Sequence, residues 1–354
     1  MSDNGVPLRQ PKSAAFDAFL VSADILLGEG AIRGMSGRLV EFFGYAPLDP
    51  EGLKHAAAKT CPFVKAQCIK PNHGGCTLEL GNEQPVIICP NRLYANEHAI
   101  LGDVAVQAFG AGVNLTSAQA IEKAKADGTL TGKEVAVFGK YWGSELSIPK
   151  PKTDEEDDTG GFYIDYVLAR LDTTGAMAEF TACEIQTIDT TNSYREQVAA
   201  LLKGEQFVDD KGRSPGWTNA GLNWANVSKR ILPQLIYKGY VLRREKYCGK
   251  GLFFVCPTAV LKRIRARLGT KMLEYPIAAG TITFQAYDIG DPVPLGQTRS
   301  LVKGETFTTT VEQVAYAFVS PVNLPEMGVY EKAIVKALIP RVPGKKKAIP
   351  PQPA

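Results

Sequence analysis

Two strand-like segments joined by a short turn constrain the fold of this chain more than any other feature. The first, FYIDYVLARLD, contains Asp165, and the second, AEFTACEIQTIDT, contains Glu184 and Gln186. Both are rich in aromatic and β-branched residues and are separated by the turn Asp172-Thr173-Thr174-Gly175, so we predict a β-hairpin. Side chains alternate along a strand, which places Glu184 and Gln186 on one face. We expect Asp165 in the middle of the first strand.

The polar side chains of this hairpin indicate either a metal site or a solvated face. An unpaired carboxylate in a buried strand is costly, so Asp165 must be exposed, paired or bound to a metal ion. Facing Glu184 and Gln186, it would form an oxygen-rich pocket suited to Mg²⁺. Taken alone, the short D…ExQ pattern favours an amphipathic hairpin with a solvated face. Evidence for a metal site has to come from other parts of the sequence.

The composition is that of a globular protein. The 354 residues suit one large domain or two smaller ones, and 45% hydrophobic with 22% charged residues is enough for a core. No apolar run reaches the roughly eighteen residues of a transmembrane helix. The polar stretch MSDNGVPLRQPKS lacks the apolar segment of a signal peptide, so we expect a cytoplasmic location.

The charge of the chain is small in total but clustered. A net charge of +3 does not by itself indicate a nucleic-acid partner. Basic residues gather within Lys262–Arg267, Arg243–Lys246 and Lys345–Lys347, opposed by the acidic run Asp154–Asp158. Such local patches can bind phosphates without a basic total, and a solvated helix face is the alternative for each of them.

Apolar spacing divides the chain into segments of helix and strand. We expect helices over residues 12–45, 49–59, 95–125 with a break near 110–112, 193–204 and 215–240. We expect strands over 134–142, 251–260 and repeatedly within 270–320, with a loop over 150–160. The predicted organisation is an N-terminal helical region (1–58), an irregular cysteine-rich segment (59–95), a core (96–340) and a Pro- and Lys-rich tail (341–354).

Four of the seven cysteines lie in one window, with the spacing Cys61-x6-Cys68-x7-Cys76-x12-Cys89. Disulfides are rare in the cytoplasm, and four thiolates in a short, loop-rich segment suggest a tetrahedral site for zinc or iron. The CxxC knuckle of common zinc fingers is missing, His73 is an alternative ligand, and cysteines without a metal are the other interpretation. We expect the remaining three to be buried as hydrophobic residues: Cys183, Cys248 and Cys256.

Taken together, these features resemble the NotI-type restriction endonucleases. The resemblance spans about residues 61–239. It is carried by the quartet ending in ICPNR, the GSE that contains Glu145, the FYIDY and CEIQT segments, and NWANVSKRILPQLIYKG.

The resemblance implies an α/β fold with a PD-(D/E)XK nuclease core, a mixed sheet flanked by helices, over residues 96–340. Asp165 and Glu184 would be the catalytic acids that hold Mg²⁺. Gln186 would stand where lysine is usual and would position the attacking water. Glu145 would be a further carboxylate near the metal or, alternatively, an acid at the start of a helix. The cysteine quartet would hold iron, with zinc as the alternative, in a structural role near the DNA.

The resemblance also implies partners. Such enzymes are bacterial homodimers that cut palindromic, GC-rich double-stranded DNA, and each works with a cognate DNA methyltransferase. Arginine and lysine read guanine in the major groove. The candidates in this chain are Arg92, Arg195, Lys229, Arg230, Arg243 and Arg244.

Two other functions are left open by the sequence. One is a repair or recombination nuclease with an iron–sulfur cluster, although here all four cysteines precede the hairpin instead of flanking the core. The other is a non-catalytic, metal-bearing DNA-binding protein, against which the acids of the hairpin argue. No GxxxxGK[ST] motif supports an ATP-driven enzyme.

Overall fold

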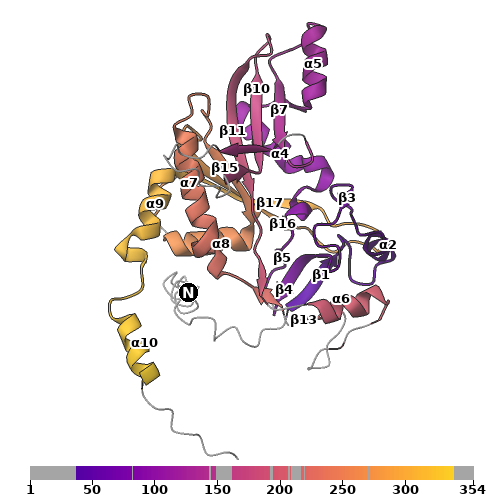
Figure 1. Ribbon diagram of the computed structural model, residues 1–354, viewed down its shortest axis with the longest axis vertical. Helices are drawn as coiled ribbons and strands as arrows, with labels where there is room; N and C mark the ends of the chain where they lie inside the picture. The colour runs from indigo at the N-terminus through magenta and orange to yellow at the C-terminus, as the bar shows by residue number, and fades with distance from the viewer. Residues whose placement is uncertain are drawn as a thin grey trace, which may run out of the picture.

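A seven-stranded mixed sheet forms the centre of the computed structural model (Figure 1). The structure describes residues 37–338 except 82, 143–144, 149–161, 192–193, 206–207, 209–216, 219 and 270. The strand order is β17 (Leu301–Thr310), β16 (Thr281–Ile289), β15 (Leu252–Pro257), β11 (Met177–Ile185), β10 (Tyr166–Leu171), β7 (Glu134–Gly139) and β6 (Asn114–Thr116). Strand β15 pairs parallel with β11 and β16, and β6 pairs parallel with β7, while the other neighbours are antiparallel. The predicted α/β class with a mixed sheet is confirmed.

Helices cover both faces of this sheet. One face packs against α4 (Ala95–Phe109), and the other against α7 (Leu232–Arg243), α8 (Thr258–Leu268) and α9 (Val311–Val319). Strand β15 shows the division, because Phe253 packs with the α4 side and Phe254 with the α7 side. All six residues of β15 are buried, as expected for a strand covered on both faces.

A smaller sheet carries the cysteine-rich segment. Its order is β13 (Trp217–Thr218), β1 (Gly37–Phe42), β4 (Gly75–Leu80) and β5 (Val86–Ile87), accompanied by α2 (Pro50–Ala58), the β2–β3 ribbon (Thr60–Cys61 and Ala66–Gln67) and α3 (Pro90–Leu93). The helix expected through residue 45 is therefore wrong for 37–42, which pair with β4 as a strand. The expectation that 60–95 is irregular misses β4, whereas the helix near 49–59 is confirmed. Asp49 caps that helix by accepting from the N–H of Glu51 at 2.9 Å.

A buried ion pair ties α3 to β1. Arg92 Nε lies 2.9 Å from Glu41 Oε2, and both side chains are almost fully buried. Thr77 donates to the same carboxylate, and Arg92 Nη2 donates to the carbonyl of Arg299 at 2.7 Å. The guanidinium also lies over the ring of Phe63. Arg92 is thus a structural residue, and the expectation that it reads a base is wrong.

The predicted hairpin is formed by β10 and β11, and its turn is built as expected. The Asp172 carboxylate accepts hydrogen bonds from the N–H groups of Thr174 and Ala176, at 2.8 and 3.0 Å, and Gly175 takes a positive φ. The expectation of strands through residue 320 is wrong for 311–319, which form α9 and bury Val311 and Val314 at helical spacing.

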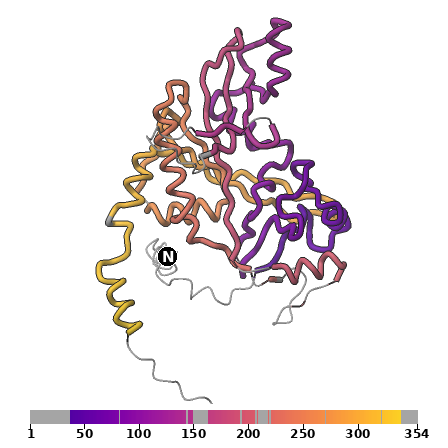
Figure 2. Tube along the Cα trace, viewed as in Figure 1, coloured from indigo at the N-terminus to yellow at the C-terminus, as the bar shows by residue number. Residues whose placement is uncertain are grey.

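The remaining elements lie around the two sheets. They are β8 (Leu146–Ile148), β9 (Phe162–Ile164), β12 (Thr190–Thr191), β14 (Gly221–Leu222), α5 (Ala118–Ala126), α6 (Arg195–Leu202), the π-helical turn η1 (Val227–Ile231), the 3₁₀ turn η2 (Pro321–Asn323) and α10 (Val329–Leu338). Figure 2 shows the chain running from α9 through α10 away from both sheets. None of the described helices is long and apolar enough to cross a membrane. The expectations for residues 12–36, 150–160 and 341–354 fall outside the described residues.

Candidate active site

Asp165 lies where β10 and β11 meet at one end of the large sheet. These strands run antiparallel with Tyr166 opposite Cys183, so the start of β10 lies beside the end of β11. Asp165 occupies a bend between β9 and β10, and the expectation of a mid-strand position is wrong. Its Oδ2 accepts a hydrogen bond of 2.8 Å from the N–H of Ile185. The bend releases Asp165 from the ladder and turns its carboxylate toward β11.

Alternation along β11 brings Glu184 to the same place. Glu184 is only 7% exposed, while its neighbours Cys183 and Ile185 pack into the α4 side of the sheet. Gln186 follows directly after the strand, and its Nε2 donates to the carbonyl of Thr187 at 3.3 Å. Glu184 and Gln186 line the same cleft, as predicted, although the strand itself ends at Ile185.

A lysine from a distant helix completes this arrangement. Lys238 on α7 places its Nζ 2.6 Å from Oε1 of Glu184, and both side chains are less than a tenth exposed. A buried ammonium is costly unless it is paired, and the contact with Glu184 supplies that pairing. Two carboxyl groups and one ammonium therefore share a site that is largely withdrawn from water.

The two carboxyl groups ionise with difficulty. Burial, followed by the nearby Asp165 carboxylate, raises the pKa of Glu184 from 4.5 to about 8 in spite of Lys238. Burial also raises the pKa of Asp165, against the opposing effects of the Ile185 N–H and the Lys238 charge. Burial is the largest cause of both shifts, and the Lys238 ammonium offsets only part of it. An additional cation would favour the fully ionised form.

These groups open onto a cleft of about 430 Å³ between the cysteine-rich segment, the large sheet and α7. One wall is formed by residues 69–94 of the cysteine-rich segment and of α3, and the other by the ends of β7 and β11 and by α7. Its lining includes Ile69, Lys70, Ile88, Asn91, Tyr94, Lys140, Asp165, Glu184, Gln186, Asp189, Gln234 and Lys238. The cysteine-rich segment is therefore adjacent to the acids.

Glu145 lies near Asp165 but is exposed. Strands β8 and β9 pair antiparallel with Leu146 opposite Ile164, so the register brings Glu145 opposite Asp165. Its charge contributes to the raised pKa of Asp165. Glu145 precedes strand β8, so the alternative role at a helix start is wrong.

The four cysteines of the quartet gather in the smaller sheet and its connections. Cys61 ends β2, Cys68 follows β3, Cys76 lies in β4 and Cys89 precedes α3, and all four are buried. The thiol of Cys76 donates a hydrogen bond to the sulfur of Cys89, which lowers the pKa of Cys89 to about 7. Burial raises the pKa of Cys68 to about 11 and also raises the pKa of Cys61, while the hydrogen bond to Cys89, followed by burial, raises the pKa of Cys76.

Backbone N–H groups point at the sulfurs of this quartet. Cys68 accepts from the amide two residues later at 3.4 Å, and Cys61 and Cys89 accept from the amides two and three residues later. Such donors favour the thiolate form. Within the described residues, no three His, Cys, Asp or Glu side chains are spaced to hold a metal ion between them. The predicted free, buried state of Cys183, Cys248 and Cys256 is confirmed.

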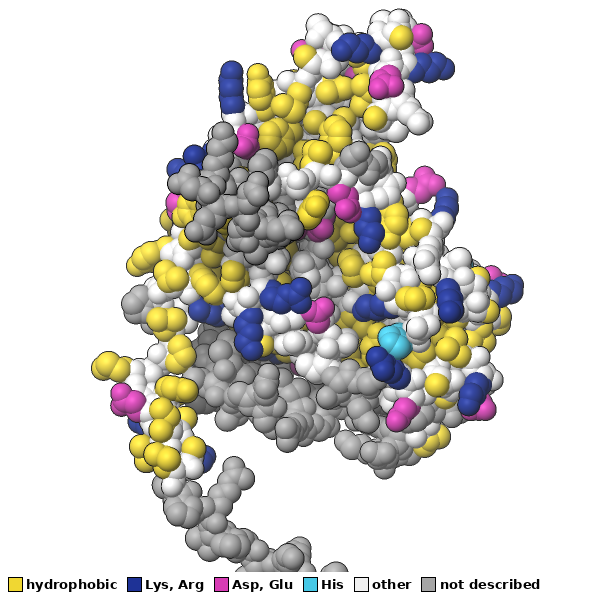
Figure 3. Space-filling model, in the orientation of Figure 1, with side chains coloured by type: hydrophobic (Ala, Val, Ile, Leu, Met, Phe, Trp, Pro, Cys, Tyr) yellow, Lys and Arg dark blue, Asp and Glu magenta, His cyan; other side chains and the backbone are white. Residues whose placement is uncertain are grey.

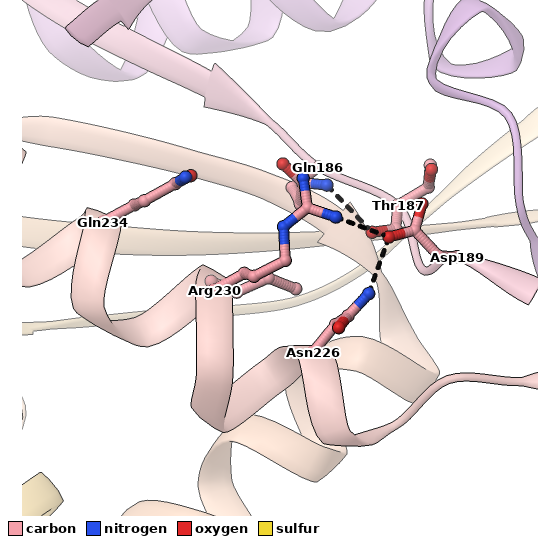
Figure 4. A pocket seen from close by; sticks show the side chains of 7 residues that line it. Gln186, Thr187, Asp189, Asn226, Arg230 and Gln234 are labelled. Carbon is pink, nitrogen blue, oxygen red and sulfur yellow. Dashed lines mark hydrogen bonds and ion pairs between the residues drawn. The ribbon is translucent and has the colours of Figure 1, made fainter. Parts of the chain in front are cut away.

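A polar cluster lies at the mouth of the cleft (Figure 4). The Asp189 carboxylate accepts from Nδ2 of Asn226 at 2.6 Å and from Nη1 of Arg230 at 2.9 Å. More than half of the Arg230 side chain is exposed. Asp189 thus holds the guanidinium in place while leaving it accessible, next to Gln186 and Thr187.

Several of the predicted basic groups are engaged within the chain. Arg243 is paired with Glu312, Arg265 with Glu305, and Arg267 donates to a backbone carbonyl of α9. On the face drawn in Figure 3, Lys and Arg side chains lie among acidic ones and do not merge into one basic band. The cluster on α8 is therefore largely structural.

Comparison with known families decides the class of this protein. The family model described as restriction endonuclease NotI matches residues 52–255, which is more than half of the chain. The chain belongs to the NotI restriction endonuclease family. It is accordingly a site-specific deoxyribonuclease that acts on DNA. A search of curated proteins found no match.

The NotI-family match contains the quartet, the acids of the hairpin and Lys238. Sequence reasoning missed Lys238, although it singled out the segment that carries it. One signal was present: Asn226, Arg230, Gln234 and Lys238 recur at intervals of four along a segment in which most of the other residues are apolar. Asp189 was also missed, because nothing in the pattern after CEIQT marks it.

Proposed function

We propose that this NotI-family enzyme is a Mg²⁺-dependent type II restriction endonuclease with a PD-(D/E)XK core, whose metal is held by Asp165 and Glu184. The observation that carries the proposal is the meeting of the buried Glu184 and the partly buried Asp165 in a cleft at one end of a mixed sheet. Mg²⁺ is commonly bound through one or two carboxylates, with water and substrate phosphate as the other ligands. Two acids are therefore a sufficient donor set.

The electrostatics of the site support a divalent cation. With both acids ionised, Asp165, Glu184 and Lys238 together carry one excess negative charge in a buried place. When bound, Mg²⁺ would polarise the phosphodiester and lower the pKa of water in contact with it. Glu184, whose pKa is raised to about 8, would then be held as the carboxylate.

Gln186 and Glu145 would have supporting roles. The Gln186 amide cannot change its charge, but its N–H and C=O can orient a water molecule or a phosphate oxygen in the cleft. Glu145 lies close enough to Asp165 to raise its pKa, so it would add negative charge for the cation.

We infer a structural iron or zinc site at Cys61, Cys68, Cys76 and Cys89. The support is chemical: four buried sulfurs lie within electrostatic reach of one another, and amides donate to three of them. Among the described residues, these side chains are not spaced to hold a metal ion between them, so elemental analysis of the purified protein is the test. Such a site would order the segment that forms one wall of the cleft.

The substrate would be a palindromic, GC-rich site in double-stranded DNA. Arg230 supports this, because its guanidinium is oriented by Asp189 at the mouth of the cleft and can donate to guanine or to a phosphate. A palindrome calls for a two-fold symmetric reader, so the enzyme would act as a homodimer. A cytoplasmic location and a cognate DNA methyltransferase complete the proposal.

The test compares DNA cleavage with DNA binding in matched variants. Asp165→Ala should lose cleavage with Mg²⁺ by at least about a hundredfold, because it removes a metal ligand, while the Kd for DNA changes little. Asp127→Ala, an exposed acid after α5, is the control and should cleave as the wild type does. Full cleavage by Asp165→Ala would refute the assignment, and wild-type protein that binds DNA without ever cutting it would refute the function.

A further inference from the structure

We propose that Lys238 supplies, from helix α7, the positive charge beside the scissile phosphate that Gln186 cannot provide. The proposal rests on the function proposed above and adds a residue to the reaction. It starts from the ammonium group that is buried against Glu184.

The position of Lys238 follows from the way its helix is wound. Asn226, Arg230, Gln234 and Lys238 recur at intervals of four and all line the cleft or its mouth. On a regular α-helix, side chains four residues apart differ in direction by about 40° around the helix axis. The π-helical turn η1 winds more loosely and offsets part of this difference. One polar row therefore runs from the mouth of the cleft to the acids.

Stability alone gives little reason for a lysine at this position. Lys238 is 6% exposed on a helix whose other buried residues include Leu232, Leu235 and Leu242. An apolar side chain in place of a buried ionic group is often neutral or stabilising. The ammonium is instead directed at the reacting centre, since its Nζ lies 2.6 Å from Oε1 of Glu184 and it lines the same cleft as Asp165.

The ammonium retains donors for a substrate. Lysine has three N–H groups, and within the described part of the chain Glu184 is the acceptor that Lys238 contacts. Lys238 also lines the cleft, so the remaining N–H groups can reach an oxygen of a bound phosphate. Two other lysines line the cleft, but Lys70 donates to the carbonyl of Ile88 and Lys140 lies over the ring of Tyr141. Only Lys238 of the three contacts an acid of the site.

The step that Lys238 would assist is hydrolysis. The oxygen of water forms a bond to phosphorus, the bond from phosphorus to the leaving oxygen breaks, water gives up a proton and the leaving oxygen gains one. Negative charge grows on the phosphate oxygens during this exchange. A preorganised ammonium stabilises that charge without transferring a proton itself.

The experiment moves the lysine from position 238 on α7 to position 186, directly after β11. Lys238→Met and Lys238→Arg are compared with Lys238→Met combined with Gln186→Lys, using single-turnover cleavage of a DNA carrying the recognition site, with Mg²⁺. The expected results are a loss of about 10²-fold or more in rate for Lys238→Met, a smaller loss for Lys238→Arg, and recovery of at least about tenfold in the combined variant. The Kd for DNA should change by less than about threefold throughout.

Controls separate chemistry from folding. Lys123→Met, on the exposed surface of α5, should cleave at the wild-type rate. If Lys238→Met does not fold, as judged by circular dichroism, Lys238→Gln replaces it, because it keeps a polar group of similar length. A folded Lys238 variant that cleaves within threefold of wild type would overturn the proposal, and so would a loss that Gln186→Lys fails to relieve. A wild-type protein inactive with Mg²⁺ would instead overturn the proposed function.

Discussion

The raised pKa of Glu184 predicts that an inactivating substitution stabilises the metal-free protein. Glu184→Gln replaces the carboxyl group by an amide of the same shape, so Lys238 keeps a hydrogen-bond partner and the packing is preserved. What disappears is a proton-binding group whose pKa is 4.5 in its ordinary state and about 8 in the folded chain. A group with a raised folded pKa stabilises the fold at low pH and loses that contribution as the pH rises through the folded value.

The size of the effect follows from the interval between the two pKa values. Each pH unit within it changes the free energy of unfolding by about 1.4 kcal/mol for one proton. Between about pH 5 and pH 7 the metal-free wild type should therefore lose roughly 3 kcal/mol relative to Glu184→Gln. Because other titrating groups are common to both proteins, the difference between them isolates Glu184.

Urea denaturation in Mg²⁺-free buffer, at several values between about pH 5 and pH 8, measures this difference. The free energies of unfolding of the two proteins should diverge with rising pH, in favour of Glu184→Gln. Adding Mg²⁺ at neutral pH should stabilise the wild type, release protons and leave the variant unchanged. Parallel pH dependences in the absence of Mg²⁺ would refute the reasoning.

Three further predictions concern the rest of the molecule. Cys89→Ser should release bound iron or zinc and lower the urea midpoint, whereas Cys248→Ser, outside the quartet, should retain the metal. Elemental analysis measures the bound metal, and a wild-type protein without metal would show that the quartet is not a metal site. Arg92→Met should cost about 3–5 kcal/mol of unfolding free energy because it leaves Glu41 buried and unpaired. Combining it with Glu41→Leu should recover much of that loss, and an Arg92→Met protein as stable as the wild type would contradict the account. Arg230→Gln should weaken DNA binding and, if the guanidinium contacts phosphate, reduce the salt dependence of log Kd by about one; an unchanged salt dependence with altered site preference would identify a base contact.

Local signals in the sequence were enough to predict the hairpin. The two arms were recognised by their aromatic and β-branched residues, and Asp172 with Gly175 marked the turn between them. The capped helix after Asp49 was predicted for the same reason, since its cap, its proline and its apolar spacing all lie within ten residues. Features determined by neighbours in the chain are the ones that a single sequence reveals.

Features determined by distant contacts could not be predicted in this way. Lys238 and Glu184 are separated by 54 positions, and no pattern around either residue indicates the other. Arg92 was included among the candidates for base recognition because its partner Glu41 lies 51 positions away, on β1. The bend at Asp165 was missed because FYIDYVLARL reads as one strand, and only pairing with β8 on one side and β11 on the other divides it.

Cleavage of a complex DNA shows whether this protein is a site-specific endonuclease that depends on Asp165. A mixed genomic DNA would be incubated with Mg²⁺ and either the wild type or Asp165→Ala, and the fragment ends would be sequenced. The account predicts discrete wild-type fragments whose ends share one palindromic sequence, and intact DNA with the variant. Wild-type ends without a common sequence, or the same fragments from Asp165→Ala, would contradict it.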